Sequence, residues 1–136
     1  MNLRELASGI QHVGIPTDDI EKTISFYTGL GFETALRTKN KVTNEPVAFL
    51  RLKNLTIETY ENRAAARRPG AIDHIALDVA DIDKTFRAAK EEGYSLLDNE
   101  VRFLPFWEHG VRFFTIEGPN AEKIEFSQML RGDADV

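Results

Sequence analysis

The chain contains no cysteine among its 136 residues. It therefore has no disulfide framework, no thiolate ligand for a structural zinc ion and no thiol nucleophile. The lack of cysteine also fits a reducing compartment. Its 42% hydrophobic and 29% charged residues are typical of a globular protein. The length suits one compact domain, which we predict to span residues 1–136.

Long apolar runs and excess positive charge are missing as well. No stretch of about 18 apolar residues occurs, so we expect no membrane span. Arg4 and Glu5 interrupt the N-terminal segment where a signal peptide needs an apolar run, which favours a cytoplasmic protein. The formal net charge of −5 makes the surface a poor match for nucleic acid, because binding to nucleic acid requires neutralisation of phosphates.

The sequence does contain an internal repeat. Residues 10–15 match residues 72–77, which lie 62 positions later. The dipeptide Ile57-Glu58 matches Ile124-Glu125 with a larger shift of 67, so about five extra residues fall in the second half. We place these extra residues within 102–110. The two repeats cover about residues 9–60 and 72–128, and a polar linker, 61–71, joins them.

Each repeat reads as one strand, one helix and three further strands. Asp18 or Asp19 is suited to cap the first helix, and Asp81 begins the second; glycines end both helices about ten residues later. The fold class predicted is α+β, with two βαβββ modules that form paired curved mixed sheets around a concave metal site. The strands are expected near 10–15, 32–38, 46–52 and 55–60, and near 72–77, 95–103, 110–117 and 122–128.

A histidine in the first strand and a glutamate in the last strand of each repeat form the candidate site. Because side chains alternate across a strand, His12 and His74 point away from the face of their apolar neighbours, and away from Gln11 and Asp73. Glu58 and Glu125 likewise point away from the apolar face. We expect all four side chains to converge in the concave face.

Four such side chains favour a divalent cation. Two carboxylates in a concave site are costly unless a proton or a cation neutralises them. The N/O ligand set suits one Ni²⁺, Zn²⁺, Co²⁺, Mn²⁺ or Fe²⁺ ion. A lone strand histidine is more often a hydrogen-bonded core residue, and a lone glutamate is usually solvated. The recurrence of both residue types in both halves favours metal ligation, with His12, Glu58, His74 and Glu125 as ligands.

The segment 10–15, followed by residues 19–32 with their Tyr-Thr-Gly-Leu-Gly-Phe ending, resembles the vicinal oxygen chelate superfamily, also called glyoxalase/bleomycin resistance/dioxygenase. The resemblance covers about residues 9–128. The set His, Glu, His and Glu is most similar to that of bacterial glyoxalase I (lactoylglutathione lyase). The resemblance implies a homodimer and a small-molecule substrate. It also implies that Arg37 contacts a glutathione carboxylate.

The expected activity is that of a divalent-metal-dependent isomerase or lyase. It would move a proton between adjacent carbons of a small oxygenated substrate through a metal-bound enediolate, with Glu125 or Glu58 as the base. Arg37, Arg51 or Arg112 would hold an anionic substrate group. The loop with Phe106 and Trp107 is either an aromatic wall over the pocket or ordinary packing of an exposed hairpin.

Other functions remain open. The chain is alternatively another metal-dependent member of the superfamily, either an epimerase or a dioxygenase, or a small-molecule or antibiotic-binding resistance protein. The residues do not choose among metals, between glutathione and another thiol, or between a site within one chain and a site shared by two chains.

Overall fold

The computed structural model describes residues 2–132. The chain divides into two compact units, Met1–Ala65 (unit 1) and Ala66–Val136 (unit 2), which are described separately. The division falls within the predicted linker 61–71, so each unit carries one of the two predicted repeats. Among the described residues, no helix is long and apolar enough to cross a membrane.

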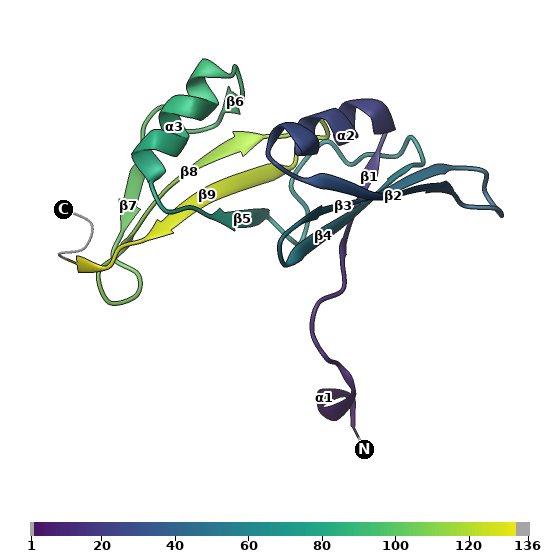
Figure 1. Cartoon of the computed structure of the whole chain (residues 1–136), viewed down its shortest axis with the longest axis horizontal. Coiled ribbons are helices and arrows are strands. Elements are labelled where there is room, and N and C mark those ends of the chain that lie inside the picture. The colour runs from purple at the N-terminus through teal and green to yellow at the C-terminus, as the bar shows by residue number, and fades with distance from the viewer. Residues whose placement is uncertain (1, 133–136) are drawn as a thin grey trace. The chain divides into compact units, whose positions relative to one another are not determined.

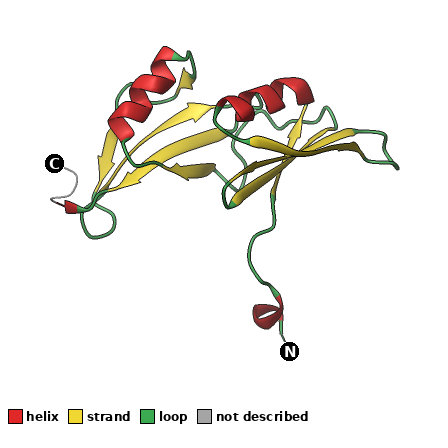
Figure 2. Ribbon diagram, in the orientation of Figure 1, coloured by secondary structure: helices red, strands yellow, loops and turns green. Residues whose placement is uncertain are grey.

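Unit 1 is a mixed sheet with one main helix (Figures 1 and 2). Its strand order is β1-β4-β3-β2, with β1 parallel to β4 and the other pairs antiparallel. Pro16 is tolerated because β1 lies at the edge of the sheet. The elements are α1 (Leu3–Leu6), β1 (Val13–Thr17), α2 (Ile20–Gly29), β2 (Glu33–Lys39), β3 (Pro46–Leu52) and β4 (Leu55–Glu61).

Unit 2 repeats this plan. Its strand order is β5-β9-β8-β6, with β5 parallel to β9 and β7 also paired with β8. The predicted α+β class with two mixed sheets is thus confirmed. The elements are β5 (His74–Asp78), α3 (Ile82–Glu91), β6 (Ser95–Leu96), β7 (Arg102–Leu104), β8 (Val111–Glu117) and β9 (Lys123–Met129).

The strand register is the same in both units. Gly14 of β1 lies opposite Glu58 of β4, and Ala76 of β5 lies opposite Glu125 of β9. These partners differ by the same shifts of 62 and 67 that the sequence repeat shows. The repeat in the sequence is therefore a repeat in strand pairing, and it brings each glutamate to the same place relative to the first strand.

Each helix is capped in the same way at its start. The side chains of Asp19 and Asp81 accept hydrogen bonds from the third residue of each helix, as predicted. A side chain from the last strand completes the cap: Glu61 Oε1 accepts a bond from Ile20 N at 2.9 Å, and Gln128 Oε1 one from Ile82 N at 2.8 Å. The last strand of each unit therefore anchors the first turn of the helix.

The core of each unit lies between the helix and one face of the sheet. In unit 1 the helix covers Leu50 and Ile57, and in unit 2 Phe114 contacts both Phe86 of α3 and Phe126 of β9. The opposite face carries Glu58 in unit 1 and Glu125 in unit 2. The buried residues include Ile20, Tyr27, Phe32, Leu50 and Ile57 in unit 1, and Ile82, Ala89, Phe114, Ile116 and Ile124 in unit 2.

The predicted strands differ most from the observed ones in three places. The first strands begin at Val13 and His74, later than residues 10 and 72, because Ile10 and Ile72 are about three-quarters exposed and pack against no sheet. The predicted strand 95–103 is broken into β6 and β7, whereas β2 continues through a single register shift. Some of the extra residues of the second repeat therefore fall at this break, before the predicted segment 102–110.

Candidate functional site

Unit 1 places His12 beside Glu58. His12 immediately precedes β1, and its Nε2 lies 3.5 Å from Oε1 of Glu58 in β4. Its Nδ1 lies 2.9 Å from Oε1 of Gln11. The edge of the imidazole meets the ring of Phe49, with centroids 5.7 Å apart. The sheet and one aromatic side chain thus hold the imidazole in place.

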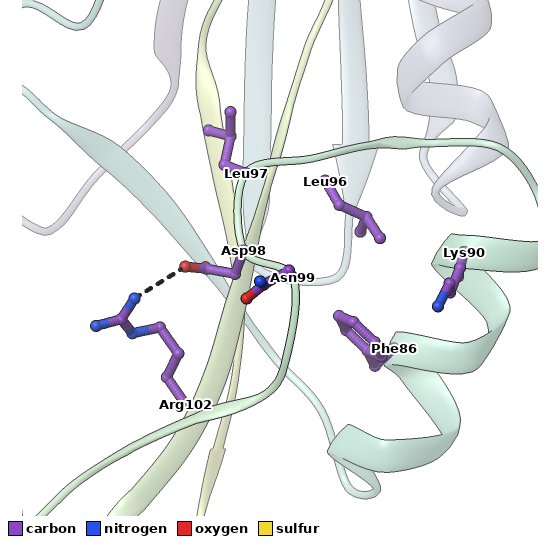
Figure 3. Close-up of a pocket in the computed structure, with 7 residues that line it drawn as sticks. All are labelled: Phe86, Lys90, Leu96, Leu97, Asp98, Asn99 and Arg102. Atoms are coloured by element: carbon purple, nitrogen blue, oxygen red, sulfur yellow. Dashed lines mark ion pairs between the residues drawn. The ribbon is translucent and has the colours of Figure 1, made fainter.

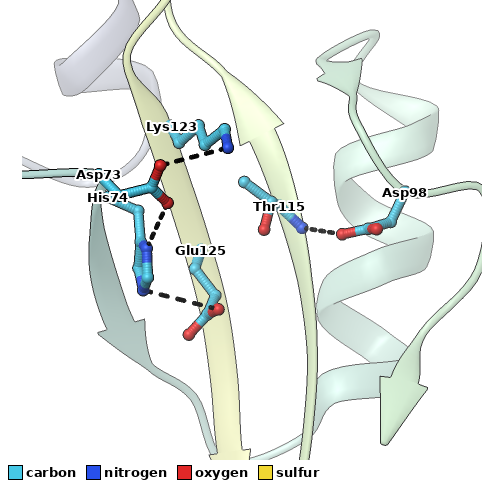
Figure 4. A network of polar contacts seen from close by, with 6 residues as sticks. All are labelled: Asp73, His74, Asp98, Thr115, Lys123 and Glu125. Atoms are coloured by element: carbon cyan, nitrogen blue, oxygen red, sulfur yellow. Dashed lines mark hydrogen bonds and ion pairs between the residues drawn. The ribbon is translucent and has the colours of Figure 1, made fainter. Parts of the chain in front are cut away.

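Unit 2 builds an equivalent pair from His74 and Glu125 (Figure 4). Nε2 of His74, the first residue of β5, lies 3.9 Å from Oε1 of Glu125 in β9. Nδ1 of His74 lies 2.9 Å from Oδ2 of Asp73. Nζ of Lys123 lies 3.4 Å from Oδ1 of the same aspartate. Asp73 thus contacts the histidine with one oxygen and the lysine with the other.

Both histidines have the same orientation: Nδ1 faces the preceding side chain and Nε2 faces the glutamate. In a neutral imidazole, a proton on Nδ1 that is donated to Asp73 or to the amide oxygen of Gln11 would leave the lone pair of Nε2 for a metal ion. Two donors that share one ion at about 2.1 Å lie about 3.0–3.4 Å apart. The observed separations of 3.5 and 3.9 Å are close to that range. The donor set in each unit therefore fits a divalent ion.

The strand alternation that we expected fails just before each strand. Gln11 and Asp73 were placed on the face opposite the histidines, but both side chains bond to the imidazoles that follow them. Neither residue is part of a strand, and the alternation of side chains applies only within one. An acceptor directly before each histidine was a signal for support of a metal ligand, and sequence reasoning missed it.

The electrostatics of unit 2 centre on Glu125. Burial raises the pKa of Glu125 above its ordinary value; His74 partly offsets this rise, and the negative charge of Asp98 adds to it. The hydrogen bond with His74 lowers the pKa of Asp73 despite some desolvation, and Lys123 acts in the same direction as His74. Glu125 is therefore a carboxylate whose charge the fold disfavours, and a nearby cation would relieve that cost.

Asp98 is a further acidic side chain of unit 2, and its charge acts on Glu125. It lies at the break between β6 and β7, where its Oδ2 accepts a hydrogen bond from Thr115 N at 2.9 Å (Figure 4). Thr115 is the strand partner of Glu125. Oδ1 of Asp98 lies 3.5 Å from Arg102 Nη1. Neither Asp98 nor Arg102 matches an equivalent residue in the first repeat, so the repeat did not identify them as candidates.

The four predicted ligands thus come together as two pairs, one in each unit. Among residues 2–132, the structure gathers no group of three or more metal-ligating side chains. A single site with all four ligands stays a prediction, as do the catalytic roles of Glu58 and Glu125.

The three predicted substrate arginines have different positions. Arg37 forms a two-bond ion pair with Glu21 of α2, and Arg112 forms one with Asp83 of α3 at 2.8 and 2.9 Å. Both therefore lie on the helix-covered face of their sheet, opposite the glutamates. Only Arg51 shares a face with the pair of its unit. It donates from Nε to Thr56 Oγ1 at 3.3 Å and lines an open cleft of about 340 Å³ with His12 and Phe49.

The aromatic loop lies away from Glu125 within its own unit. Phe106 and Trp107 follow β7 and are 55% and 74% exposed, and their role as a wall over the pocket stays a prediction. The adjoining residue Val111 pairs with Met129, four residues along β9 from Glu125, which is about 13 Å at the spacing of a strand.

Two further clefts flank the sheets. In unit 1 a cleft of about 230 Å³ lies beside Glu58 and Tyr60. In unit 2 the break between β6 and β7 leaves an open cleft of about 550 Å³ against α3 (Figure 3). It is lined by Phe86, Lys90, Leu96, Leu97, Asp98, Asn99 and Arg102.

Comparisons with known proteins agree on one family. The model of the Glyoxalase/Bleomycin resistance protein/Dioxygenase superfamily matches residues 11–127. The uncharacterized protein YwbC of Bacillus subtilis is 32% identical over 133 residues, which cover 90% of this chain and 99% of that protein.

Solved structures share the fold at lower identity. A glyoxalase family protein from Enterococcus faecalis has a TM-score of 0.75 at 22% identity, covering 90% of this chain and 98% of its own. The fosfomycin resistance protein FosX from Listeria monocytogenes, in complex with Mn(II) and sulfate, has a TM-score of 0.70 at 17% sequence identity. The match covers 94% of this chain and 98% of that one. A glyoxalase I mutant from Zea mays has a TM-score of 0.70 at 18% sequence identity, and the match covers 88% of this chain and 44% of that one.

Proposed function

The chain belongs to the Glyoxalase/Bleomycin resistance protein/Dioxygenase superfamily, and we propose that it is a divalent-metal-dependent isomerase or lyase of the glyoxalase type. It would move a proton between adjacent carbons of a small oxygenated substrate. His12, Glu58, His74 and Glu125 would together hold one ion. The observation that carries the proposal is the His–Glu pair that recurs in both units with the same register and the same imidazole orientation.

The donor chemistry supports this proposal. Each imidazole offers Nε2, each carboxylate is half-buried, and the pairs contain only nitrogen and oxygen donors. The FosX structure with Mn(II) shows that one protein of this fold was crystallised with a divalent ion. The native ion of this chain is proposed only as a class, namely Ni²⁺, Zn²⁺, Co²⁺, Mn²⁺ or Fe²⁺.

The ion would supply Lewis acidity, which makes a C–H bond beside a carbonyl more acidic. The chain would supply the proton transfer. Glu125 is the stronger candidate for the base, because burial raises its pKa and a more basic carboxylate takes a proton more readily. Arg51, steadied by Thr56, would bind an anionic group of the substrate in the cleft that it shares with His12.

Metal content of the purified protein is the first test. We expect one divalent ion per chain, and we expect His74→Ala to lose it. His109→Ala is the matched control, because His109 belongs to neither pair; its Nε2 lies 3.7 Å from Oε1 of Glu108. A protein that stays metal-free after incubation with Ni²⁺, Zn²⁺ and Mn²⁺ would refute the proposal.

Proton transfer is the second test. The metal-loaded protein should exchange a carbon-bound proton of hydroxyacetone or of a methylglyoxal–thiol adduct with D₂O, as followed by NMR. Glu125→Gln, assayed at a metal concentration that loads the variant, should lower the exchange by about 10²–10⁴-fold. Full exchange in Glu125→Gln would contradict the role proposed for this residue.

Members of the superfamily are commonly dimers, and we propose a homodimer here as well. A mixture of His12→Ala and His74→Ala chains tests whether the ion is shared by two copies. If one copy supplies the His12 pair and the other the His74 pair, a mixed dimer regains one intact site. If both pairs come from one copy, mixing recovers no metal binding.

A further inference from the structure

The residues that support the two histidines differ in charge. Nδ1 of His74 bonds to the carboxylate of Asp73, whereas Nδ1 of His12 bonds to the amide of Gln11, both at 2.9 Å. The two acceptors occupy the same position, directly before the histidine. The two units therefore allow a direct comparison of an amide and a carboxylate as the acceptor for a histidine, at the same distance.

A carboxylate is the stronger acceptor for an imidazole N–H. Hydrogen bonds to an ionised acceptor are roughly twice as strong as those between neutral groups. Such a partner fixes the proton on Nδ1, orients the ring and makes the other nitrogen a better metal donor. A neutral amide orients the ring but adds much less electron density to it. Nε2 of His74 should therefore be the better ligand of the two.

Lys123 holds the aspartate in place for this role. Its Nζ lies 3.4 Å from Oδ1 of Asp73, which leaves Oδ2 for His74 (Figure 4). Lys123 is also the strand partner of His74, so the three side chains meet at the start of the β5–β9 pair. All three are at least a third exposed, so the ion pair by itself adds little stability. Its effect is on orientation.

We propose that Asp73, anchored by Lys123, is a positioning residue for His74 and makes the His74–Glu125 pair the tighter half of the metal site. The inference rests on the proposed function. It assigns unequal affinity to the two pairs: the unit 2 pair holds the ion more tightly than the unit 1 pair does.

Reciprocal substitutions test this inference. Asp73→Gln gives His74 the acceptor that His12 has, and Gln11→Asp gives His12 the acceptor that His74 has. Co²⁺ affinity of the full chain is measured by competition with a chelating dye. We expect Asp73→Gln to weaken binding by about 10–100-fold, the usual effect of removing such a support, and Gln11→Asp to tighten it.

The separate pairs can be compared directly. The double variant His12→Ala/Glu58→Gln keeps only the unit 2 pair, and His74→Ala/Glu125→Gln keeps only the unit 1 pair. We expect the first to bind Co²⁺ more tightly than the second. The opposite order, or equal affinity, would overturn the inference.

The effect of Asp73 on His74 can also be measured in the metal-free protein, where it does not depend on how much metal is bound. Nitrogen-15 shifts of the imidazoles report which ring nitrogen carries the proton. We expect His74 to carry it on Nδ1, and Asp73→Ala to shift it largely to Nε2 without a change at His12. Gln11→Ala is the matched control, and it should change His12 alone.

The outcomes separate the two proposals. A wild-type protein that binds no ion would overturn the proposed function and this inference with it. A wild-type protein that binds the ion, with an affinity that Asp73→Gln leaves unchanged, would overturn the inference alone. The inference would also be overturned if the proton of His74 stayed on Nδ1 in the Asp73→Ala variant.

Discussion

In unit 1, β2 runs unbroken along β3, whereas in unit 2 the equivalent edge is divided into β6 and β7 and Asp98 bonds to Thr115 in the gap. Nevertheless, the first and last strands pair in the same register in both units. In each unit the histidine lies at the start of the first strand or directly before it, and the glutamate lies in the last strand. The His–Glu pair therefore tolerates change at the far edge of the sheet, because that edge does not set its geometry.

The cores of the units also differ at one equivalent position. Thr59 of β4 and Phe126 of β9 are both buried and directly follow Glu58 and Glu125. They hold the same place in the register, opposite Ile15 and Leu77. Phe126 stacks on Phe114, while Thr59 Oγ1 is a buried atom without a hydrogen-bond partner among the described residues. Unit 2 fills this position with an aromatic ring, and unit 1 leaves a polar atom there.

The largest effect is expected on activity. Glu125→Gln should lower turnover by about 10²–10⁴-fold, the usual contribution of a general base. The metal-free fold should be at least as stable as wild type at pH 7, since burial raises the pKa of Glu125. A carboxyl with a raised pKa costs stability as pH rises through that pKa, and glutamine removes this cost. Thermal melts of the metal-free proteins should coincide below about pH 4 and diverge above it. A less stable variant at pH 7 would contradict the desolvation argument.

The next effect is on stability and compares the two cores. Ile57 and Ile124 are equivalent and almost fully buried. Substitution of either by alanine should cost about 2–5 kcal/mol, as for large-to-small changes in other cores. Urea unfolding measures the loss, and Val42→Ala, at a 94% exposed site, should change little. A loss below about 1 kcal/mol at either isoleucine would show that the two cores are not equally packed.

A smaller gain is expected at the position where the cores differ. Thr59→Val keeps the shape of the side chain and removes the unpartnered hydroxyl, so it should raise the free energy of unfolding by about 1 kcal/mol. Thr17→Val is the matched control. Its hydroxyl lies 2.8 Å from Thr23 Oγ1 and accepts from Asp19 N, so the same change should destabilise the protein. Equal effects at the two threonines would argue that Thr59 has a partner in solution.

The smallest effect concerns the arginines bound to the helices. Arg112 lowers the pKa of Asp83 through its hydrogen bonds. Such a carboxyl contributes stability above its unfolded pKa and loses it as pH falls through the lowered one. Arg112→Met should therefore cost about 0.2–1 kcal/mol near pH 7, and less below about pH 4. Urea unfolding at both pH values measures the difference, and a cost that does not shrink in acid would point to lost packing.

Periodicity and capping residues were sufficient to predict the helix and most strands of each repeat. Asp19 and Asp81 begin the helices as expected, and the shift between the repeats equals the shift in strand pairing. These features depend on local chemistry and on alternation within strands, which a sequence displays directly. The His–Glu pairing in each unit follows from the same rules.

The arginines and the histidine supports could not be predicted in this way. Arg37 and Arg112 are bound by acidic residues of the helices, and such pairing depends on how a helix lies over its sheet. Gln11 and Asp73 precede their strands, where alternation gives no direction. Asp98 replaces a backbone acceptor at a strand break that no residue pattern marked.

The caps supplied by Glu61 and Gln128 have a consequence for synthesis of the chain on the ribosome. Each helix receives one of its first hydrogen bonds from a residue 41 or 46 positions further along the chain. Neither unit can close until its last strand has emerged, because that strand carries both the cap and the partner of the first strand. Unit 1 is complete at about residue 61, so it can fold while the second half is still being translated. A chain cut short before residue 123 would leave Asp81 as the side-chain cap of α3, without the bond from Ile82 N to Gln128, and would leave β5 without a neighbour.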